Sequence, residues 1–383
     1  MTGNTLISLL SYAMGNKNDP PAFPEAKGGW REIYTVLQKH DLAHFAGYAL
    51  RKAGKTAGDS EVQSVLDRAT DTAAFRYMKI NRDILDITSA LEETGVPHIL
   101  LKGSVIRKYY PEPWLRTSCD IDVLIKSEDI ERAKAAFADE LEYTYLSAWN
   151  YEISYETPAG THIELHHTLC DGEGRENEIL ASVWERSHLK EGTSYTYEMS
   201  DEMYYFYHVA HMAKHFVSGG CGIRPFVDMW VLGTRVEFDR EKRYALLDAG
   251  GLLAFARAAE QLAFVWLGGE EHTALTEALE EFTLSGGTYG TMENRVAVNQ
   301  ARHGSKLSYL MSRIFLPYDR LKLSYPRLEG RRWLTPFYQV KRWFRLALRG
   351  RLEKSVREAK TTAALTDDVN RRTTDLLREL GIE

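Results

Sequence analysis

The sequence predicts an α+β fold in which a small mixed sheet with helices is flanked by N-terminal helices and by a larger C-terminal helical domain. Three observations support this prediction. Apolar residues recur at helical spacing up to residue 95, short apolar runs with strand-like alternation occupy residues 96–200, and helical spacing returns from residue 201. We therefore expect three regions, at residues 1–95, 96–200 and 201–383.

Composition and charge exclude several classes of protein. The 383 residues are 44% apolar and 27% charged, with a mean hydropathy of -0.37, as in ordinary soluble globular proteins. A net charge of -6 excludes a protein whose whole surface binds nucleic acid. The three cysteines form no CxxC pair, which argues against a disulfide framework and fits a reducing compartment. No signal peptide or membrane-spanning run is visible, so we expect a cytoplasmic protein.

The predicted sheet follows a long helix. Ile80, Ile84, Ile87 and Leu91 share one face of a helix over residues 70–94, which Gly95-Val96-Pro97 ends. The expected elements after it are a strand at 98–101, a short helix at 105–110, a strand at 120–125, a helix at 127–141, and strands at 143–155 and 161–169.

Two acids in the strand at 120–125 need an explanation. Asp120 and Asp122 project from the same face of that strand, because alternate strand residues point the same way. Neighbouring carboxylates repel each other. They are explained by a bound divalent cation, by a structural Arg or Lys partner, or by an exposed strand end.

A third acid favours the cation. In the strand at 161–169, Glu164 and His166 share one face. Mg²⁺ prefers oxygen ligands, and two such ions can assist an in-line displacement at phosphorus. Asp120, Asp122 and Glu164 are therefore candidate catalytic residues and metal ligands. His166 could orient an acceptor or act as a base, although an exposed strand imidazole is the simpler interpretation.

A small turn precedes these acids and suits a phosphate. Gly103 lets a phosphate approach the backbone, and Ser104 offers a hydroxyl and N–H groups at the start of a short helix. Lys102 could neutralise a triphosphate. Arg116 could also bind phosphate, or form a salt bridge with Asp120 or Asp122. The pattern predicts an NTP co-substrate bound beside Mg²⁺.

These motifs resemble a known family. Gly103-Ser104, Asp120-Ile121-Asp122 and the later Glu164 are similar to the nucleotidyltransferase superfamily that includes DNA polymerase beta. The segments LLKGS, YYPEPWLRTSCDIDVLI and IELHHTL resemble, more closely, an uncharacterised bacterial nucleotidyltransferase family. Later segments, including YHVAHMAKH and WLTPFYQVKRWFRLAL, extend the likeness over residues 30 to 350.

The resemblance implies a fold and a reaction. It implies a small mixed nucleotidyltransferase sheet, dependence on Mg²⁺, and transfer of NMP from an NTP, with Asp120 and Asp122 as metal ligands and Glu164 as the third acid. It does not imply an acceptor, which could be a small molecule or a macromolecule. The alternatives are a toxin-like or regulatory enzyme that nucleotidylates a protein or tRNA, and an inactive nucleotide-binding module.

Three histidines lie on one face of a later predicted helix. His208, His211 and His215 have no HExxH arrangement that would indicate zinc catalysis. They form either a packed, hydrogen-bonded face or, for His211 and His215, part of the nucleotide pocket. Arg224 and Asp228 are four residues apart and are expected to form an ion pair, although the resemblance also makes Asp228 a candidate for the pocket.

A basic segment rich in aromatic residues occupies residues 331–354. It could bind RNA, lie on a membrane surface, or pack on the protein's own helices. We favour packing, because Pro336 breaks any long helix and because Trp333 and Trp343 would otherwise be exposed.

Overall fold

The computed structural model describes residues 2–17, 19–24, 27–149, 151–170, 174–288, 290–303, 306–348 and 352–382. The chain forms two compact units, Met1–Ala213 with Ile223–Glu280, and Lys214–Gly222 with Glu281–Glu383. These units divide the chain differently from the three regions expected from the sequence. The sheet and the helices before it belong to one unit, together with residues 201–213 and 223–280 of the helical part that follows.

The chain begins with four helices: α1 (Thr2–Ala13), α2 (Lys27–Lys39), α3 (Ala43–Ala53) and α4 (Ser60–Glu93). The predicted long helix is confirmed, but it starts ten residues earlier than expected. Asp59 caps it by accepting hydrogen bonds from the N–H groups of Glu61 and Val62. Gly95, at a φ of +69°, lets the chain turn away after its last residues.

One mixed sheet follows, in the order β3-β4-β5-β2-β1-β7-β6. Its strands are β1 (His98–Leu100), β2 (Asp120–Ile125), β3 (Thr144–Ala148), β4 (Glu152–Glu156), β5 (His162–His166), β6 (Ser187–Leu189) and β7 (Thr196–Met199). β2 pairs with β5 in parallel, as β1 does with β7, and the other neighbours are antiparallel. The predicted α+β class is confirmed. The strand expected over 143–155 is two strands, and β6 and β7 were not predicted.

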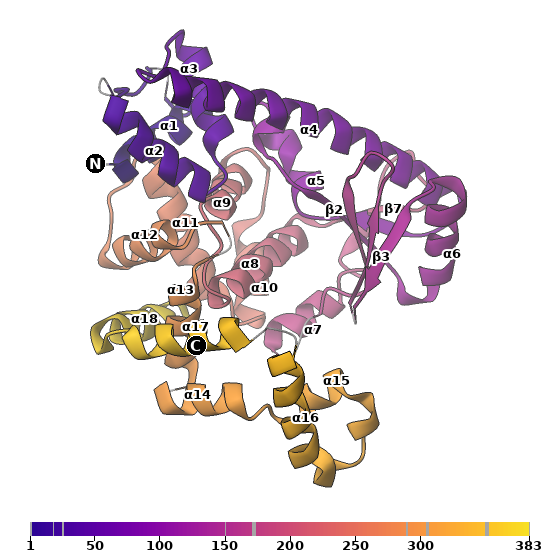
Figure 1. The fold of residues 1–383 in the computed structure, drawn as a ribbon. Coiled ribbons are helices and arrows are strands. Elements are labelled where there is room, and N and C mark those ends of the chain that lie inside the picture. Colours follow the sequence, from indigo (N-terminus) through magenta and orange to yellow (C-terminus); the bar gives the residue numbers. More distant parts are fainter. Residues whose placement is uncertain are drawn as a thin grey trace. The chain divides into compact units, whose positions relative to one another are not determined.

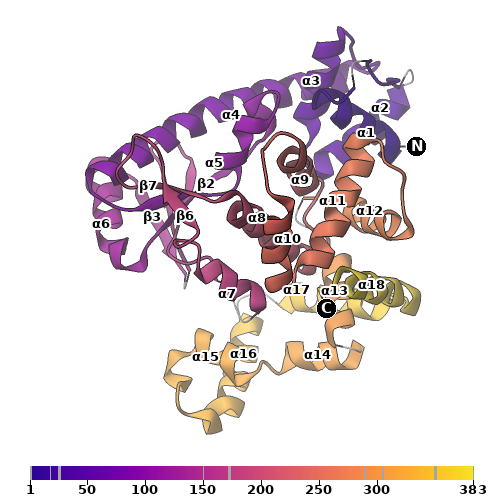
Figure 2. The same cartoon turned by 180° about the vertical axis from the view of Figure 1, so that it is seen from behind.

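One face of this sheet carries the core of the first unit. Ile121, Val123 and Ile125 point to it and pack with the second half of α4 and with Ala133 and Phe137. Those two residues lie in α6 (Ile130–Ala135) and in the π-helical turn that continues it over Ala136–Glu140. Figures 1 and 2 both show α4 running beside the sheet. The other face of β2 is therefore the face that carries Asp120 and Asp122.

Between β1 and β2 the chain makes short helical turns. They are α5 (Gly103–Ile106) and two 3₁₀ turns, Arg107–Tyr109 and Pro113–Leu115. The helical turns expected at 105–110 are thus confirmed as one α-helical and one 3₁₀ turn. Leu115 is fully buried, and its carbonyl oxygen lies 2.9 Å from Nε2 of the buried His44 on α3. The loop that leads into β2 is therefore anchored to the N-terminal helices.

After the sheet the chain is helical. Its helices are α7 (Arg175–Ala181), α8 (Asp201–Val217), α9 (Arg224–Thr234), α10 (Arg240–Ala249), α11 (Leu253–Gly268), α12 (Ala274–Gly286), α13 (Met292–His303), α14 (Lys306–Ile314), α15 (Tyr318–Ser324), α16 (Thr335–Leu348), α17 (Leu352–Ala364) and α18 (Asp367–Leu380). Among the described residues, no helix is long and apolar enough to cross a membrane.

Pro336 does not interrupt a helix. It is the second residue of α16, where proline is tolerated because the N–H groups of the first turn have no partner within the helix. The expected break was wrong for this reason. Residues 349–351 of the basic segment lie outside the described residues.

Candidate active site

The pairing of two parallel strands brings two of the predicted acids together. In the β2–β5 ladder Asp122 stands opposite Glu164, and Asp120 stands opposite His162. Parallel neighbours in register point their side chains to the same face. The expectation that the three acids stand on neighbouring strands is confirmed.

Asp122 is the centre of the site. It is 2% exposed, and its Oδ1 lies 2.6 Å from Nζ of Lys102 and 2.9 Å from Nε2 of His166. Burial alone raises the pKa of a carboxyl group, but the Lys102 ammonium and the His166 hydrogen bond together hold the pKa of Asp122 well below its usual range. Asp122 is therefore an anion with two cationic neighbours.

Lys102 is placed by an unusual backbone conformation. Its φ is +47°, a region that L-residues rarely adopt. Its carbonyl oxygen accepts a hydrogen bond of 2.9 Å from the Tyr204 hydroxyl, and its Nζ lies 3.9 Å from Oε2 of Glu164. Burial lowers the pKa of Lys102, but the Asp122 carboxylate outweighs burial and raises that pKa above its usual value. Lys102 thus carries its positive charge between the two acids.

His166 is buried rather than exposed, so the simpler interpretation of this residue was wrong. Besides Asp122, its Nε2 lies 3.4 Å from Glu164, and its Nδ1 lies 3.8 Å from Oε2 of Glu152 on β4. Burial lowers the pKa of His166, but the hydrogen bonds with Asp122 and Glu164 raise it to about 9. Sequence reasoning missed Glu152, because only the β4–β5 register, which sets it opposite His166, brings it here.

Among the described residues, the ligand atoms of Asp122, Glu164 and His166 lie within 4.8 Å of one another and could hold a metal ion. Asp120 is not in this group, although it shares the face. Burial and the Asp122 charge raise the pKa of Asp120 above its usual value. Carboxylate oxygens are the ligands that Mg²⁺ prefers, so the two strands offer a donor set that fits this ion.

The turn beside the acids differs from the expected phosphate cradle. α5 has four residues, and the Ser104 N–H is bonded to the Leu101 carbonyl oxygen at 3.2 Å. The space beside Gly103 is instead bordered by guanidinium groups. A Cβ on Gly103 would lie 3.4 Å from Nη1 of Arg116 and 3.6 Å from Nη2 of Arg107. Side chains, rather than a helix end, supply the positive charge here.

Arg107 is the residue that sequence reasoning missed at this turn. It is 5% exposed and donates to the Gly103 carbonyl oxygen at 2.7 Å and to the Ser118 hydroxyl at 2.8 Å. Among the side chains that the structure describes, no carboxylate lies within 4.0 Å of it. Burial and the Arg116 charge lower the pKa of Arg107 to about 10. The available signal was its position three residues after Ser104, one helical turn further on.

Arg116 pairs with neither predicted partner. Its Nε lies 2.8 Å from Oδ1 of Asp228 on α9, which also accepts a hydrogen bond of 2.6 Å from the Tyr110 hydroxyl. The expected Arg224–Asp228 ion pair is also wrong, because Arg224 pairs with Asp41 at 2.6 Å. Asp228 is fully buried, and its charge raises the pKa of Arg116 above its usual value although burial lowers it.

Two tyrosines of α8, Tyr204 and Tyr207, lie near the site. Tyr204 bonds to the Lys102 backbone, and burial raises the pKa of Tyr207, which also interacts electrostatically with Lys102 and Asp122. On the histidine face, His208 is packed, with Nε2 3.2 Å from the Pro225 carbonyl oxygen, and the ring of His211 lies 6.1 Å from that of Tyr207. His215 belongs to the second compact unit, so its place in a nucleotide pocket stays a prediction.

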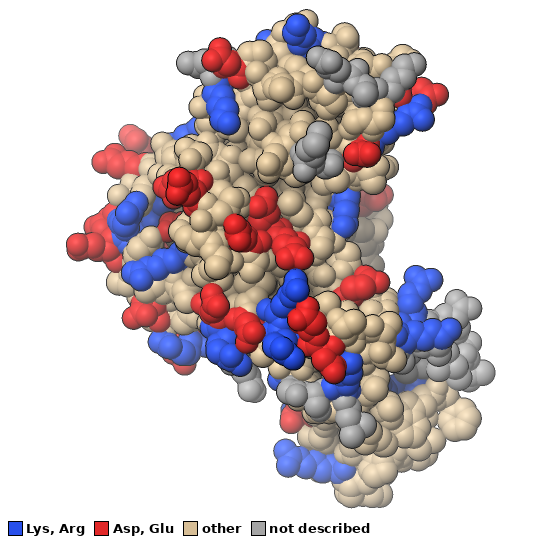
Figure 3. Space-filling model, turned by 90° about the vertical axis from the view of Figure 1, so that its left-hand side faces the viewer, with Lys and Arg blue, Asp and Glu red and all other residues tan. Residues whose placement is uncertain are grey.

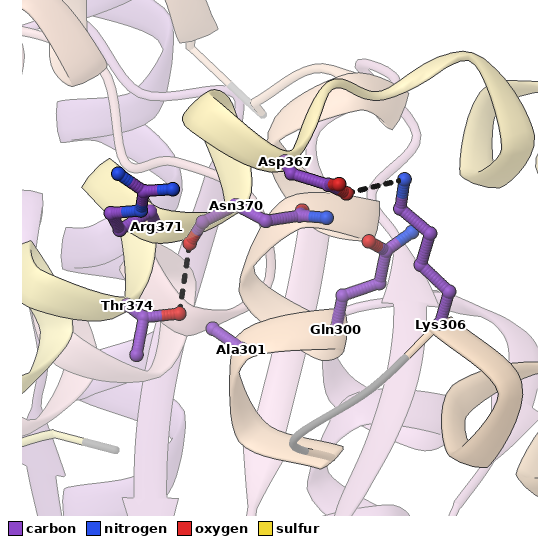
Figure 4. Close-up of a pocket in the computed structure, with 7 residues that line it drawn as sticks. All are labelled: Gln300, Ala301, Lys306, Asp367, Asn370, Arg371 and Thr374. Carbon is purple, nitrogen blue, oxygen red and sulfur yellow. Dashed lines mark hydrogen bonds and ion pairs between the residues drawn. The ribbon is translucent and has the colours of Figure 1, made fainter.

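A cavity of about 320 Å³ in the second unit has a different lining (Figure 4). Seven residues line it: Gln300, Ala301, Lys306, Asp367, Asn370, Arg371 and Thr374. Asp367 is the one carboxylate among them, and Lys306 holds it at 3.0 Å. This cavity therefore lacks the two neighbouring carboxylates that the sheet offers for a metal ion.

One comparison with known proteins, the match to a protein family, covers the site on the sheet. A family profile described as an uncharacterised nucleotidyltransferase matches residues 26–268, which include the whole of this site. A solution structure of the antibiotic-resistance factor ANT(2'')-Ia is similar over 49% of this chain and 93% of its own, at 14% identity and a TM-score of 0.26. The search of curated proteins found no match.

Proposed function

The chain belongs to the uncharacterised nucleotidyltransferase family, and on that premise we propose that it transfers NMP from an NTP to an acceptor in a Mg²⁺-dependent reaction that releases pyrophosphate. The observation that carries this proposal is the Asp122–Glu164 pair, which the β2–β5 register holds beside the Lys102-Gly103-Ser104 turn. Acids and cations stand close together there, as transfer of a charged phosphoryl group requires.

The side chains around the turn suit the triphosphate. Lys102, Arg107 and Arg116 would bind its oxygens, and the Ser104 hydroxyl would donate to one of them. Arg107 is the best suited of the cations, because it has no carboxylate partner among the described side chains. Arg107 and Arg116 both stand beside Gly103, where a phosphate that approached the turn would meet both guanidinium groups.

The acids suit metal ions. Asp122 and Glu164, with Asp120 at the same face, would hold up to two Mg²⁺ ions. Bound there, the ions would neutralise triphosphate charge and favour displacement at the α-phosphorus. Lys102 and His166 share Asp122 in the present arrangement, so we expect at least one of them to change partner when a cation binds.

The proposed reaction involves an acceptor, the α-phosphorus of the NTP and a pyrophosphate leaving group. An acceptor oxygen or nitrogen bonds to the α-phosphorus, the bond from that phosphorus to the oxygen bridging to the β-phosphorus breaks, and pyrophosphate leaves with the electron pair. The acceptor loses one proton. Glu164 would accept it, because its carboxylate faces the site from β5 and has only more distant charged neighbours than Asp122 has: His166, His162 and Lys102 at 3.4, 3.7 and 3.9 Å.

Ligand-induced stabilisation tests this function directly. Mg²⁺ with ATP, CTP, GTP or UTP should raise the melting temperature, since a ligand that binds only the folded state stabilises it. The double variant Asp120→Asn with Asp122→Asn should lose that gain, whereas Asp139→Asn, on the exposed end of the π-helical turn, should keep it. If no NTP shifts the melting temperature of folded protein, the nucleotide site is wrong.

The acceptor is tested separately. NTP labelled at the α-phosphate, incubated with the protein and a cell lysate, should place the label on a small molecule if the acceptor is one. Label on a protein or tRNA would indicate the toxin-like or regulatory alternative. Binding of NTP with no pyrophosphate release in any lysate would indicate an inactive nucleotide-binding module.

A further inference from the structure

A row of large apolar side chains is exposed along α16 and the turn that precedes it. Trp333, Phe337, Val340 and Phe344 are 78%, 63%, 44% and 67% exposed. Spacings of three and four residues place Phe337, Val340 and Phe344 on one side of α16, and Trp333 lies in the 3₁₀ turn Arg332–Leu334 directly before it. We refer to these four residues as the α16 face.

The opposite side of α16 is packed, so the exposure of this face is not the result of a loose helix. Tyr338 packs on the small core of Leu321, Tyr325 and Leu328, with its ring centroid 5.0 Å from that of Tyr325. Trp343 donates from Nε1 to the Ile314 carbonyl oxygen at 3.0 Å. These contacts fix which side of the helix faces outward.

The expected packing of the segment is therefore only half right. Trp343 packs against Phe315, with ring centroids 5.5 Å apart, and is 36% exposed. Trp333 is not covered, and the prediction was wrong for it. Phe315 and two residues of α14, Met311 and Ile314, are themselves 45% to 49% exposed, so the apolar surface extends beyond α16.

Basic side chains accompany the α16 face. Residues 331–348 contain three arginines in addition to Lys341 and Arg342, and they contain no acid. Arg331, Arg332, Lys341 and Arg345 are exposed, and no carboxylate among the described side chains lies within 4.0 Å of them. The chain as a whole is acidic, and on the face drawn in Figure 3 acidic and basic side chains are interspersed. Residues 331–348 thus differ in charge from the chain as a whole.

We propose that α16 docks on an anionic lipid surface, with the α16 face inserted among the acyl chains at the interface and the basic residues at the headgroups. A short amphipathic helix with aromatic residues on one side and Lys and Arg beside them is the form of an interfacial helix. An RNA-binding surface uses rings that present flat faces for stacking, and Val340 in the middle of the row does not serve that purpose. At 14 residues α16 is about 21 Å long, which suits lying in the interface.

Vesicle sedimentation with the full chain tests the proposal. The protein should pellet with vesicles of phosphatidylcholine mixed with phosphatidylserine, should pellet less as salt is raised, and should stay in solution with phosphatidylcholine alone. Phe337→Ser with Phe344→Ser should weaken binding at least about tenfold, and Lys341→Glu with Arg345→Glu should do the same.

Matched controls separate this surface from general stickiness. Phe75→Ser removes an aromatic side chain on α4 that is 65% exposed, and Lys55→Glu reverses an exposed charge before α4; both should bind vesicles like the wild type. The proposal is overturned if the α16 variants pellet with vesicles as well as these controls do, or if the wild-type protein pellets with none of the vesicles. It is also overturned if labelled RNA, measured by anisotropy, binds through the same residues while vesicles do not.

Discussion

The site on β2 and β5 and the α16 face both contain basic and aromatic side chains, but these side chains have different surroundings in the two regions. At the site on β2 and β5, Lys102 and Arg116 each have a carboxylate within 3 Å, and Tyr204 and Tyr207 are buried. On α16 the cations have no described carboxylate partner and the aromatic rings are exposed. In the first region the charges are paired within the chain. In the second region the charges and the apolar surface are exposed to solvent and available to a binding partner.

This contrast teaches which residues resist substitution. A buried charge pair is costly to break from one side, because the remaining charge stays in a medium of low dielectric. Exposed charges and rings contribute little to the free energy of unfolding. The predictions below sharpen the contrast, beginning with the largest expected effect.

Breaking the Arg116–Asp228 pair should cost the most. Arg116→Met or Asp228→Asn should each lower the free energy of unfolding by about 3–5 kcal/mol, since each leaves one buried group without its partner. The double variant should lose less than the sum of the two. Urea unfolding measures all three variants, and Arg82→Met, which breaks the exposed pair with Asp86, should cost under about 1 kcal/mol. Fully additive losses would contradict the pairing.

Acidification should destabilise, through His44, the anchoring of the loop that leads into β2. Burial lowers the pKa of His44 to about 4, below its ordinary value of 6.5, so the unfolded chain takes up this proton first. His44 therefore favours the folded state fully above pH 6.5, and this contribution is lost as the pH falls to 4, by about 3 kcal/mol in total. His44→Gln should show a correspondingly weaker decline in urea unfolding over this window. Parallel declines in the two proteins would rule out this role.

Arg107→Met should weaken nucleotide use more than folding. Because this guanidinium has no carboxylate partner to leave behind, its loss should raise the KM for NTP about tenfold or more. The melting temperature of the free protein should fall only by the amount that the loss of its hydrogen bonds to Gly103 and Ser118 causes. Lys108→Met, at the exposed neighbouring position, is the matched control and should leave KM unchanged. Equal KM values for both variants would remove Arg107 from the site.

Removing aromatic rings from the α16 face should have the smallest effect on stability. Phe337→Ser and Phe344→Ser should each change the free energy of unfolding by no more than about 0.5 kcal/mol. Tyr325→Ala, in the core beneath α16, should cost about 3 kcal/mol. If the two phenylalanine variants unfold as readily as the tyrosine variant, the α16 face is covered by the chain itself.

The sequence predicted those parts of the site that depend on local periodicity. The alternation around Asp120 and Asp122, and that around Glu164, predicted two strands with acids on one face, and the β2–β5 register confirms their meeting. The partners of Arg116 and His166 could not be read this way. Arg116 reaches Asp228 across 112 residues, and His166 is buried only because β4 and β2 flank it.

Elements that are short, or that depend on their surroundings, could also not be predicted from the sequence. β6 and β7 have three and four residues, too few for alternation to stand out. The effect of Pro336 depended on where α16 begins, which local pattern did not reveal. Arg107 looked like one basic residue among several, and its burial comes from the packing of the turns around Gly103.

The parallel register of β2 and β5 limits how this site can change over evolutionary time. Residues 162, 164 and 166 share the site face as His, Glu and His, whereas Ile163 and Leu165 are fully buried in the core on the other side. Substitutions could move the acidic residue to another position on β5 two residues away, and it would still lie on the face that carries Asp122. An insertion or deletion of one residue within the strand would turn the whole row inward and present the core to water. Length changes in relatives of this chain are therefore expected in the loops beside β5 and not within it.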